Sequence, residues 1–553
     1  MCKKLIGVFK KNKFSAIYYT VILIVFFLSR LVCLSKLPRG MHIDEISMGY
    51  NVWSLSRYGT DRYGVSYPIY FDNDGSGQSS LYIYVATILA KVFGYSIVTL
   101  RLPAVLFGLL LLIFVSLSAY KMFGKNCAYI ASAVVTVMPV FVMGERFAFD
   151  CNAFLPMFSM VLYFGIKSTE SDKWYYQVLL GLSISLCFYS YILSLIIIPS
   201  FLLVTLIYLF LYKRISLSKV GMVFLTAGIF SLPMICYILV LTGVLSSFNI
   251  GAISITPASI QRVSEVGYQG KPLSIILKNL FEITDHDNYN FVANEKFGVF
   301  YANRVFGGLS LSQVLLLIAF VFVLTVCIIK NKRKEFNYET IIIIALFSTL
   351  TPLYFTEGFA TYRYESFLVV CVFLISCMFD FMITHKLRVI SLLICIIFLF
   401  NFGSYLIYIF GGNFEKDSLV YFDSDLLSLC ENINFKEYED YQFYIDDTAT
   451  YNTGLIVLYA LRVPPSDTRG DTTGTSGRQY GNIHIGIPED VKDEKAVYII
   501  KDLSKESSLY TDIDDSISVY KKILNGNKAR NELLGIGARE EVYNGYDIYY
   551  IEN

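Results

Sequence analysis

Long apolar runs constrain this chain more strongly than any other feature of its sequence. Each of the longest runs has about the length of a helix that crosses a bilayer, roughly 20 residues. Lipid offers no hydrogen-bond partners, so only helices or closed barrels span it, and these long unbroken runs exclude barrel strands. The sequence therefore predicts a bundle of membrane-spanning helices. The clearest runs are Ala16–Cys33, Leu102–Tyr120, Val220–Leu241, Leu311–Ile329 and Val389–Phe410.

The apolar segments number about 11, which predicts a polytopic α-helical membrane protein. The first follows a basic start and precedes no clear small-residue cleavage site, so we interpret it as a retained signal anchor. The stretch 174–212 is too long for one helix, and we expect it to turn at Tyr189-Ser190-Tyr191. The predicted spans lie at 16–36, 99–120, 127–143, 153–168, 174–189, 191–212, 217–243, 311–330, 340–356, 364–383 and 388–410.

Basic residues in the short connectors between these spans predict the sidedness of the chain. They all fall on one side, which the positive-inside rule makes cytoplasmic. An odd number of spans that starts from a cytoplasmic N-terminus leaves the C-terminal segment outside a cell membrane. The connectors hold Lys3, Lys4, Lys10, Lys11 and Lys13; Lys121 and Lys125; Lys213, Arg214 and Lys219; Lys330, Lys332, Arg333 and Lys334; Lys386 and Arg388.

Three parts of the chain lie on the outer side in this topology. Two are loops of a transmembrane module at 1–410, and they cover about 37–98 and about 244–310. The third is 411–553, where the composition changes abruptly and a loop rich in Gly, Thr and Ser lies at 469–479. We predict a small extracytoplasmic α/β domain there, with strands at Tyr441–Asp446, Leu455–Leu461, Ala496–Lys501 and Tyr546–Ile551.

Composition argues against several functions. Only 16% of the residues are charged and the net charge is +1, which leaves no basic field for nucleic acid. No Gly-rich phosphate loop follows a strand, and no cytoplasmic segment is long enough for a nucleotide-sugar site. The 11 cysteines lie mostly in apolar runs and imply no disulfide framework. The absence of internal repeats leaves a secondary transporter without support.

The first outer loop carries the residues with the clearest chemistry. Asp44 and Glu45 follow the end of the first span by a few residues, close to the membrane surface. Neighbouring positions of a helix point about 100° apart and do not face each other. One carboxylate can therefore enter a cavity while the other makes a structural contact. The loop also holds Tyr70-Phe71-Asp72-Asn73-Asp74, and Arg101-Leu102-Pro103 follows at the entry to the second span.

This pattern resembles the C-type glycosyltransferases, over roughly 16–410 and most strongly over 37–103. The shared features are a first span, an Asp-Glu pair at its outer end, amphipathic loop helices and the Arg-Leu-Pro motif. The most similar branch is the protein O-mannosyltransferase-like group, which includes the bacterial aminoarabinose transferase of lipid A. The resemblance implies the C-type glycosyltransferase fold, a sugar donor linked to polyprenyl phosphate, an acceptor on the outer face, and no essential metal or other cofactor.

The resemblance also implies roles for the acidic residues, with Asp44 and Glu45 as the predicted catalytic pair and Asp44 as the base. A carboxylate suits this role, because an acceptor hydroxyl that attacks an anomeric carbon must lose its proton. The second acidic position of the family falls near Asp72 or Asp74. An Asp-Asn-Asp-Gly stretch is also typical of a turn, and charges beside a membrane interface are common, so structural interpretations stay open.

Other residues are candidates for binding the substrates. The leaving lipid phosphate needs cations or backbone donors, and the resemblance assigns this role to Arg363, next to Tyr362 at the tenth span. A snorkelling interfacial arginine is the alternative. At the outer turns of the bundle the candidates are the pair Glu145-Arg146, which also fits a structural ion pair, together with Asp150 and Tyr191.

The second outer loop holds Asp285-His286-Asp287, which has the residue types of a metal site. Three consecutive residues do not converge easily, since tight metal sites spread their ligands over wider spacings and add a supporting shell. We therefore predict no metal here and keep Asp285 and His286 as substrate-binding candidates.

The leading hypothesis is an inverting glycosyltransferase of the cell membrane that uses a polyprenyl-phosphate sugar and a hydroxyl acceptor outside. The sugar stays open, and so does the acceptor, which is a protein, a cell-wall polymer or a glycolipid. A carrier-charging enzyme and a flippase for the donor are implied partners. The alternatives are a non-enzymatic glycolipid flippase or exporter, and a surface-polysaccharide polymerase or ligase. A transporter should carry ionisable residues in mid-span, whereas the charges here gather at one outer face.

Overall fold

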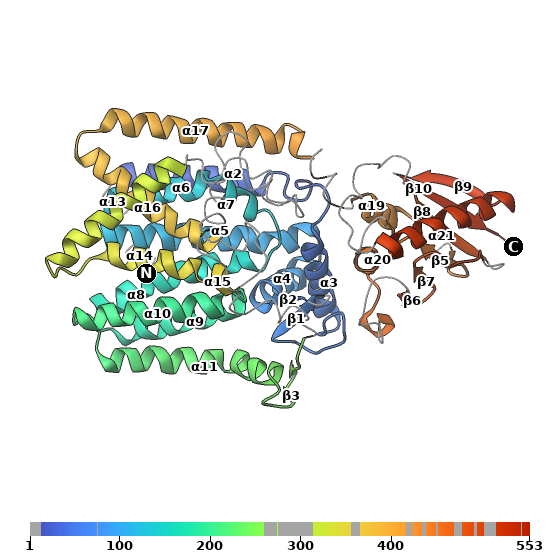
Figure 1. The fold of residues 1–553 in the computed structure, drawn as a ribbon, viewed down its shortest axis with the longest axis horizontal. Coiled ribbons are helices and arrows are strands. Elements are labelled where there is room, and N and C mark those ends of the chain that lie inside the picture. The colour runs from blue at the N-terminus through green and yellow to red at the C-terminus, as the bar shows by residue number, and fades with distance from the viewer. Residues whose placement is uncertain are drawn as a thin grey trace.

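A bundle of long helices forms most of the molecule, and a smaller α/β unit lies beyond one end of it (Figure 1). This architecture comes from a computed structural model. The structure describes residues 13–73, 76–258, 274, 313–355, 365–415, 418, 422, 424–433, 438–448, 452–468, 478–491, 495–502, 516–543 and 545–552.

Every predicted span corresponds to a helix or to a pair of consecutive helices. Among the described residues, 7 helices are long and apolar enough to cross a membrane by length and composition. The predicted fold class, a polytopic helical membrane protein with a C-terminal α/β unit, is confirmed. The bundle contains α2 (Lys13–Leu31), α5 (Ile97–Phe123), α6 (Lys125–Val137) with α7 (Pro139–Gly144), α8 (Cys151–Glu170), α9 (Trp174–Ser190), α10 (Ser194–Leu211), α11 (Leu217–Leu241), α13 (Gln313–Lys332), α14 (Tyr338–Leu350) with α15 (Pro352–Phe355), α16 (Glu365–Thr384) and α17 (Arg388–Phe410).

The two ends of the bundle differ in chemistry. The short turns after α5, α10, α13 and α16 hold the basic residues and lie at the end far from the α/β unit (Figure 1). In three of these turns a lysine has a positive φ: Lys213, Lys334 and Lys386. The four predicted connectors that lie between described helices therefore share one end of the bundle, while Lys3, Lys4, Lys10 and Lys11 lie outside the described residues. Which compartment this end faces stays a prediction.

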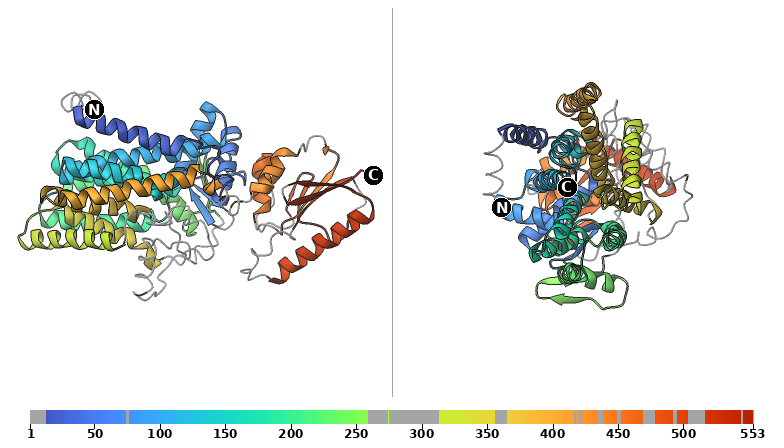
Figure 2. Two further views of the ribbon diagram at one scale, coloured as in Figure 1. Left: turned by 90° about the horizontal axis from the view of Figure 1, so that it is seen from above. Right: turned by 90° about the vertical axis from the view of Figure 1, so that its left-hand side faces the viewer.

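The first outer loop folds into helices and a hairpin at the opposite end. It contains α3 (Ile43–Arg57), the antiparallel strands β1 (Tyr70–Asn73) and β2 (Ser76–Ser79), and α4 (Ser80–Phe93). These elements lie between the bundle and the α/β unit, as the blue segments of Figure 2 show. After α11, a second hairpin of β3 (Phe248–Ile250) and β4 (Ile253–Ile255) joins them. The Ser254 amide donates to the Ser66 carbonyl at 2.9 Å, which ties the two loops together.

The α/β unit is built on a six-stranded sheet with the order β6-β7-β5-β8-β10-β9. The central strand β5 runs parallel to both of its neighbours, and the remaining pairs are antiparallel. The strands are β5 (Gln442–Ile445), β6 (Gln479–Tyr480), β7 (Ile483–Ile485), β8 (Ala496–Lys501), β9 (Arg539–Tyr543) and β10 (Tyr546–Ile551), with helices α19 (Ser424–Asn432), α20 (Thr453–Leu461) and α21 (Ser516–Gly535) and a 3₁₀ turn at Pro465–Thr468.

Three of the four predicted strands are confirmed as β5, β8 and β10, but the strand predicted at Leu455–Leu461 is wrong. That segment belongs to α20. Its residues from Thr453 to Tyr459 are all buried, so the sequence shows a continuous apolar run without a polar face. Such a run has the same appearance in a buried strand and in a buried helix, and periodicity alone does not separate them.

Candidate functional site

The beginning of α3 presents Asp44 and Glu45 in the first turn of the helix. His42 caps this helix: its ring accepts a hydrogen bond from the Asp44 amide, while the Glu45 side chain accepts one from the His42 amide. Reciprocal bonds of this kind satisfy backbone donors that a helix otherwise leaves open. The cap fixes where the helix starts and therefore the directions in which the two carboxylates point.

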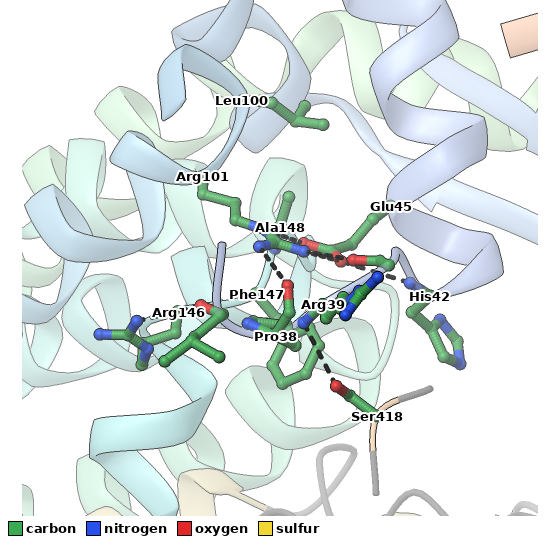
Figure 3. A network of polar contacts seen from close by, with 12 residues as sticks. Pro38, Arg39, His42, Glu45, Leu100, Arg101, Arg146, Phe147, Ala148 and Ser418 are labelled. Carbon is green, nitrogen blue, oxygen red and sulfur yellow. Dashed lines mark hydrogen bonds and ion pairs between the residues drawn. The ribbon is translucent and has the colours of Figure 1, made fainter. Parts of the chain in front are cut away.

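Glu45 points into the protein and is completely buried. Its two oxygens accept hydrogen bonds from Nε and Nη2 of Arg101, each at 3.0 Å. The Ala148 amide donates a third bond at 2.7 Å. Figure 3 shows Glu45 on α3 and Arg101 on α5 pointing toward each other, with Ala148 beside them. A buried charge is tolerated where it is paired and hydrogen-bonded, and Glu45 meets both conditions.

Arg101 belongs to a group of three buried arginines, which we call the arginine frame: Arg30, Arg101 and Arg146. Arg101 also donates to the carbonyls of Leu34, Pro38 and Gly40, which form the chain between α2 and α3. The frame therefore holds this segment in place from the inside.

The other two arginines secure the end of α2. Arg146 donates four bonds of 2.9–3.0 Å to the carbonyls of Ser29, Arg30, Val32 and Leu37. Carbonyls at the end of a helix lack partners within the helix and carry a partial negative charge, so a guanidinium satisfies both needs. Arg30 pairs with Glu145 at 2.7 Å. The predicted candidates Glu145 and Arg146 thus bond to α2 and its continuation.

Asp44 has a different environment. Its side chain is 29% exposed, and Nδ2 of Asn73 donates to Oδ1 at 2.9 Å. Oδ2 lies 3.5 Å from Nδ1 of His42, and that nitrogen already accepts the bond from the Asp44 amide. Gln78 donates to the backbone carbonyl of Asp44 at 2.9 Å. Neutral donors from the β1–β2 hairpin thus position this carboxylate and leave it partly open.

Asp150, in the turn between α7 and α8, lies in the same neighbourhood. The Ser79 amide, at the end of β2, donates to its Oδ2 at 2.8 Å. Burial raises the pKa of Asp150 to about 7; the Ser79 hydrogen bond lowers this pKa, and the negative charge of Asp44 raises it. The hairpin therefore brings together two of the predicted residues, Asp44 and Asp150, which are far apart in the sequence.

The remaining predicted residues fall into two groups. Asp72 lies on β1, where its backbone carbonyl accepts a bond of 3.4 Å from Arg62, and Tyr191 caps the C-terminal end of α9. Among the described residues, no group of three or more His, Cys, Asp and Glu side chains could hold a metal ion. The other predicted residues lie outside the described part of the chain, namely Asp74, Asp285, His286, Tyr362 and Arg363.

Several residues at this site received no role from the sequence. In the sequence, Arg101 stood out only as part of the Arg-Leu-Pro motif, and Arg30 only as part of the first apolar run. An arginine near the end of such a run is unusual, because a charge in a span marks either a partner or a function. Asn73 and Gln78 gave no signal of their own, since neutral amides are common in loops.

Known proteins share the fold described above. The profile of the dolichyl-phosphate-mannose-protein mannosyltransferase family matches residues 78–240. No curated protein sequence matches the chain. Among solved structures, ArnT from Cupriavidus metallidurans bound to undecaprenyl phosphate has a TM-score of 0.56 at 10% identity, and the match covers 97% of this chain and 98% of ArnT. The same ArnT in the apo state has a TM-score of 0.56 at 11% identity and covers 97% of each chain.

A third match is the oligosaccharyltransferase of Archaeoglobus fulgidus in complex with Zn and sulfate. Its TM-score is 0.52 at 14% identity, and the match covers 80% of this chain and 61% of the archaeal enzyme. At these identities the likeness is one of fold. The resemblance seen in residues 37–103 thus extends to the architecture of nearly the whole chain.

Proposed function

We propose that this chain, which has the fold of the C-type glycosyltransferases, moves a sugar from a polyprenyl-phosphate donor to a hydroxyl acceptor. The observation that carries the proposal is the contrast at the start of α3, where Asp44 is partly open and Glu45 is fully engaged. Two comparisons support a lipid-phosphate donor: the matching family acts with dolichyl-phosphate mannose, and the ArnT structure contains undecaprenyl phosphate.

In the proposed reaction, Asp44 is the base. Its Oδ2 takes the proton from the acceptor hydroxyl as the hydroxyl oxygen attacks the anomeric carbon. The new glycosidic bond forms while the bond from that carbon to the phosphate oxygen breaks, and polyprenyl phosphate leaves with the electron pair. Attack from the side opposite to the phosphate inverts the anomeric centre. Asn73, which donates to Oδ1, keeps Oδ2 directed at the acceptor.

Glu45 is proposed as a positioning residue rather than as a second catalytic carboxylate. Both of its oxygens accept bonds from Arg101, and the side chain is completely buried. A carboxylate in this state has no route to a substrate proton. Its role is to hold the first turn of α3 against α5, so that Asp44 keeps a constant position.

The donor phosphate requires positive charge, and we keep Arg363 and Tyr362 as the proposed ligands on the basis of the family resemblance. Asp150 and Asp72 are proposed to contact the sugar, because both belong to the region around the β1–β2 hairpin. Tyr191, Asp285 and His286 remain candidates for contacts with donor or acceptor. Glu145 and Arg146 are proposed to act only through the position of α2.

The test is Asp44→Asn, which keeps the shape of the side chain and the bond from Asn73 but removes the basic oxygen. Mass spectrometry of cell-surface glycans and glycoproteins should show the loss of one specific sugar addition. The matched control is Asp172→Asn, because Asp172 is fully exposed beyond the other end of α8. An unchanged glycan profile with a normally inserted Asp44→Asn protein would refute the proposed base.

Sidedness needs its own test, because the proposal places the site outside the cell membrane. Arg57, at the exposed end of α3, is a suitable position for an introduced cysteine, and Asp172 is the comparison at the other end. A membrane-impermeant maleimide should label Arg57→Cys and not Asp172→Cys in intact cells, with the native cysteines as background. Labelling of only the Asp172→Cys protein would place the catalytic loop in the cytoplasm and end the proposal.

A flippase, an exporter or a polysaccharide polymerase can be separated from this function in detergent solution. There is only one compartment in detergent, so transport leaves no product, whereas glycosyl transfer releases free polyprenyl phosphate. The purified protein with a lipid-linked sugar and an acceptor extract should release it in an Asp44-dependent manner. Extension of the product by many sugar units would point to the polymerase instead.

A further inference from the structure

The α/β unit contains a crevice that the glycosyl-transfer site does not use. β5 and β8 are adjacent and parallel, and the helices that follow them cover opposite faces of the sheet. α20 packs with Phe443 and Ile445 on one face, while α21 packs with Tyr444 and Tyr498 on the other. In open α/β sheets, ligands bind outside the carboxyl ends of the strands at such a switch point.

A cavity of about 330 Å³ lies near this crevice, at the carboxyl ends of β5 and β7 and beside α21. Its volume falls in the range of about 300–1,000 Å³ that is usual for small-molecule sites. The carboxyl end of β5 contributes two carboxylates, β7 contributes an imidazole, and α21 contributes an amine. The residues that matter for its chemistry are Tyr444, Asp446, Asp447, Arg478, His484 and Lys522.

The charges that line the cavity balance one another. Asp447 pairs with Lys522 at 2.8 Å. Asp446 is held in place by the amides of Thr448 and Lys501, at 2.9 and 3.1 Å. With Arg478 as the second cation, the lining has two negative and two positive groups. A strongly anionic ligand would face the carboxylates, and a cation would face the guanidinium and the amine, so the lining favours a ligand without net charge.

The lining also has an aromatic surface beside these polar groups. The rings of Tyr444 and His484 are stacked, with centroids 4.8 Å apart, and His484 is fixed by a bond of 2.9 Å between its Nε2 and Oε1 of Gln442. Tyr444 is only 3% exposed, because its other face stacks on Tyr498 at 4.8 Å, so the flat face that remains is that of the His484 ring. Sugar rings combine an apolar C–H face with hydroxyls, and each hydroxyl both donates and accepts. A sugar would therefore use the carboxylates, the cations and the His484 ring together.

We propose that this crevice binds one sugar unit of an uncharged glycan. Binding is non-covalent and involves none of the residues at the start of α3, so the proposal stands apart from the role of Asp44. The α/β unit would then be a saccharide-binding part of the protein in addition to its contacts with the outer loops.

The experiment uses the full-length protein in a detergent without a sugar head group. Saturation-transfer NMR is recorded with glucose, galactose, mannose and N-acetylglucosamine, one at a time. At least one sugar should receive saturation from the wild-type protein, and the signal should fall at least fivefold in Asp447→Asn and in His484→Ala. Asp490→Asn is the matched control, because Asp490 is exposed and pairs with Lys528 outside the cavity.

Each other outcome overturns the proposal. No saturation transfer to any of the four sugars contradicts a saccharide site, and a signal that inorganic phosphate abolishes indicates an anion site. A signal that persists in both variants comes from elsewhere in the protein. Asp44→Asn should retain the signal, and its loss there would assign the binding to the outer loop. If Asp447→Asn fails to fold, His484→Ala decides, since His484 is only partly buried at the cavity wall.

Discussion

Asp44 and Glu45 are consecutive in the chain, yet they belong to two regions with opposite chemistry. Glu45 faces the arginine frame, where every charge lies deep in the protein and bonds to another charge or to carbonyls. Asp44 faces the hairpin, where the neutral amide of Asn73 donates to its carboxylate. The difference teaches that a paired buried charge builds the scaffold, whereas a charge held by neutral donors remains available for chemistry.

From this comparison we expect the largest loss of stability when a charge pair of the arginine frame is broken. Glu45→Ala would leave Arg101 as an unpaired charge in the interior, and breaking a buried pair in this way costs roughly 3–5 kcal/mol. The free energy of unfolding in detergent should fall by about this amount, and transfer activity should fall with it because α3 loses its anchor. Denaturant titration and an activity assay on the same preparation measure both.

The same position offers a sharper variant. Glu45→Gln keeps the volume of the side chain and one acceptor oxygen, so it should recover part of the stability and part of the activity together. A Glu45→Gln protein that unfolds like the wild type but has lost transfer would show that Glu45 takes part in the chemistry. The contrast between the two regions would then be wrong.

The α/β unit also contacts α3, and Gly49 is one of the residues at this contact. A Cβ added at Gly49 would lie 2.7 Å from Cε2 of Tyr459 on α20 and 3.0 Å from a side-chain atom of Leu100. Gly49→Ala should therefore lower the free energy of unfolding by about 1–3 kcal/mol through overpacking. Since Asp44 starts the same helix, activity should fall as well.

Gly165→Ala is the control for this substitution, because a Cβ at Gly165 on α8 would meet nothing within 4 Å. Alanine there should leave stability unchanged or raise it by roughly 0.5–1 kcal/mol, the usual gain over glycine inside a helix. If Gly49→Ala behaves like Gly165→Ala, the α/β unit does not brace α3 in solution.

A further effect concerns pH and the hairpin region. The pKa of Asp150 is about 7 in the folded protein, while an unfolded chain gives an aspartate pKa of about 3.9. Between these values the folded state holds a proton that the unfolded state has lost, so this group makes the protein less stable as the pH rises from about 4 to about 7. Asp150→Asn should not show this loss of stability with rising pH. It should therefore become more stable than the wild type between about pH 4 and about pH 7.

Unfolding measured at several pH values tests this expectation, with the exposed Asp172→Asn as the reference. The difference in stability between Asp150→Asn and the wild type should grow with pH and level off above pH 7. A difference that stays constant from pH 4 to pH 8 would mean that Asp150 titrates as an exposed aspartate.

The sequence predicted the spans because each apolar run has the length that lipid demands, and this signal is local. Helix geometry also predicted that the side chains of Asp44 and Glu45 would point in different directions. It could not name Arg101 as the partner of Glu45, since the two are 56 residues apart and only the packing of α3 on α5 joins them. The sequence likewise could not name Asn73 as the partner of Asp44, since the two are 29 residues apart. The error at Leu455–Leu461 has a related cause, because burial on all sides removes the periodicity that distinguishes a helix.

The smallest predicted effect comes from an arginine close to the frame but outside it. Arg39 pairs with Glu415 at 2.8 Å, and the two side chains are 53% and 45% exposed. Exposed pairs contribute about 0–1 kcal/mol and weaken with salt. Arg39→Gln should therefore change the free energy of unfolding by less than about 1 kcal/mol, and less in high salt, whereas Arg101→Gln should cost several times more. Equal losses at the two positions would show that burial does not separate scaffold charges from surface charges at this end of the bundle.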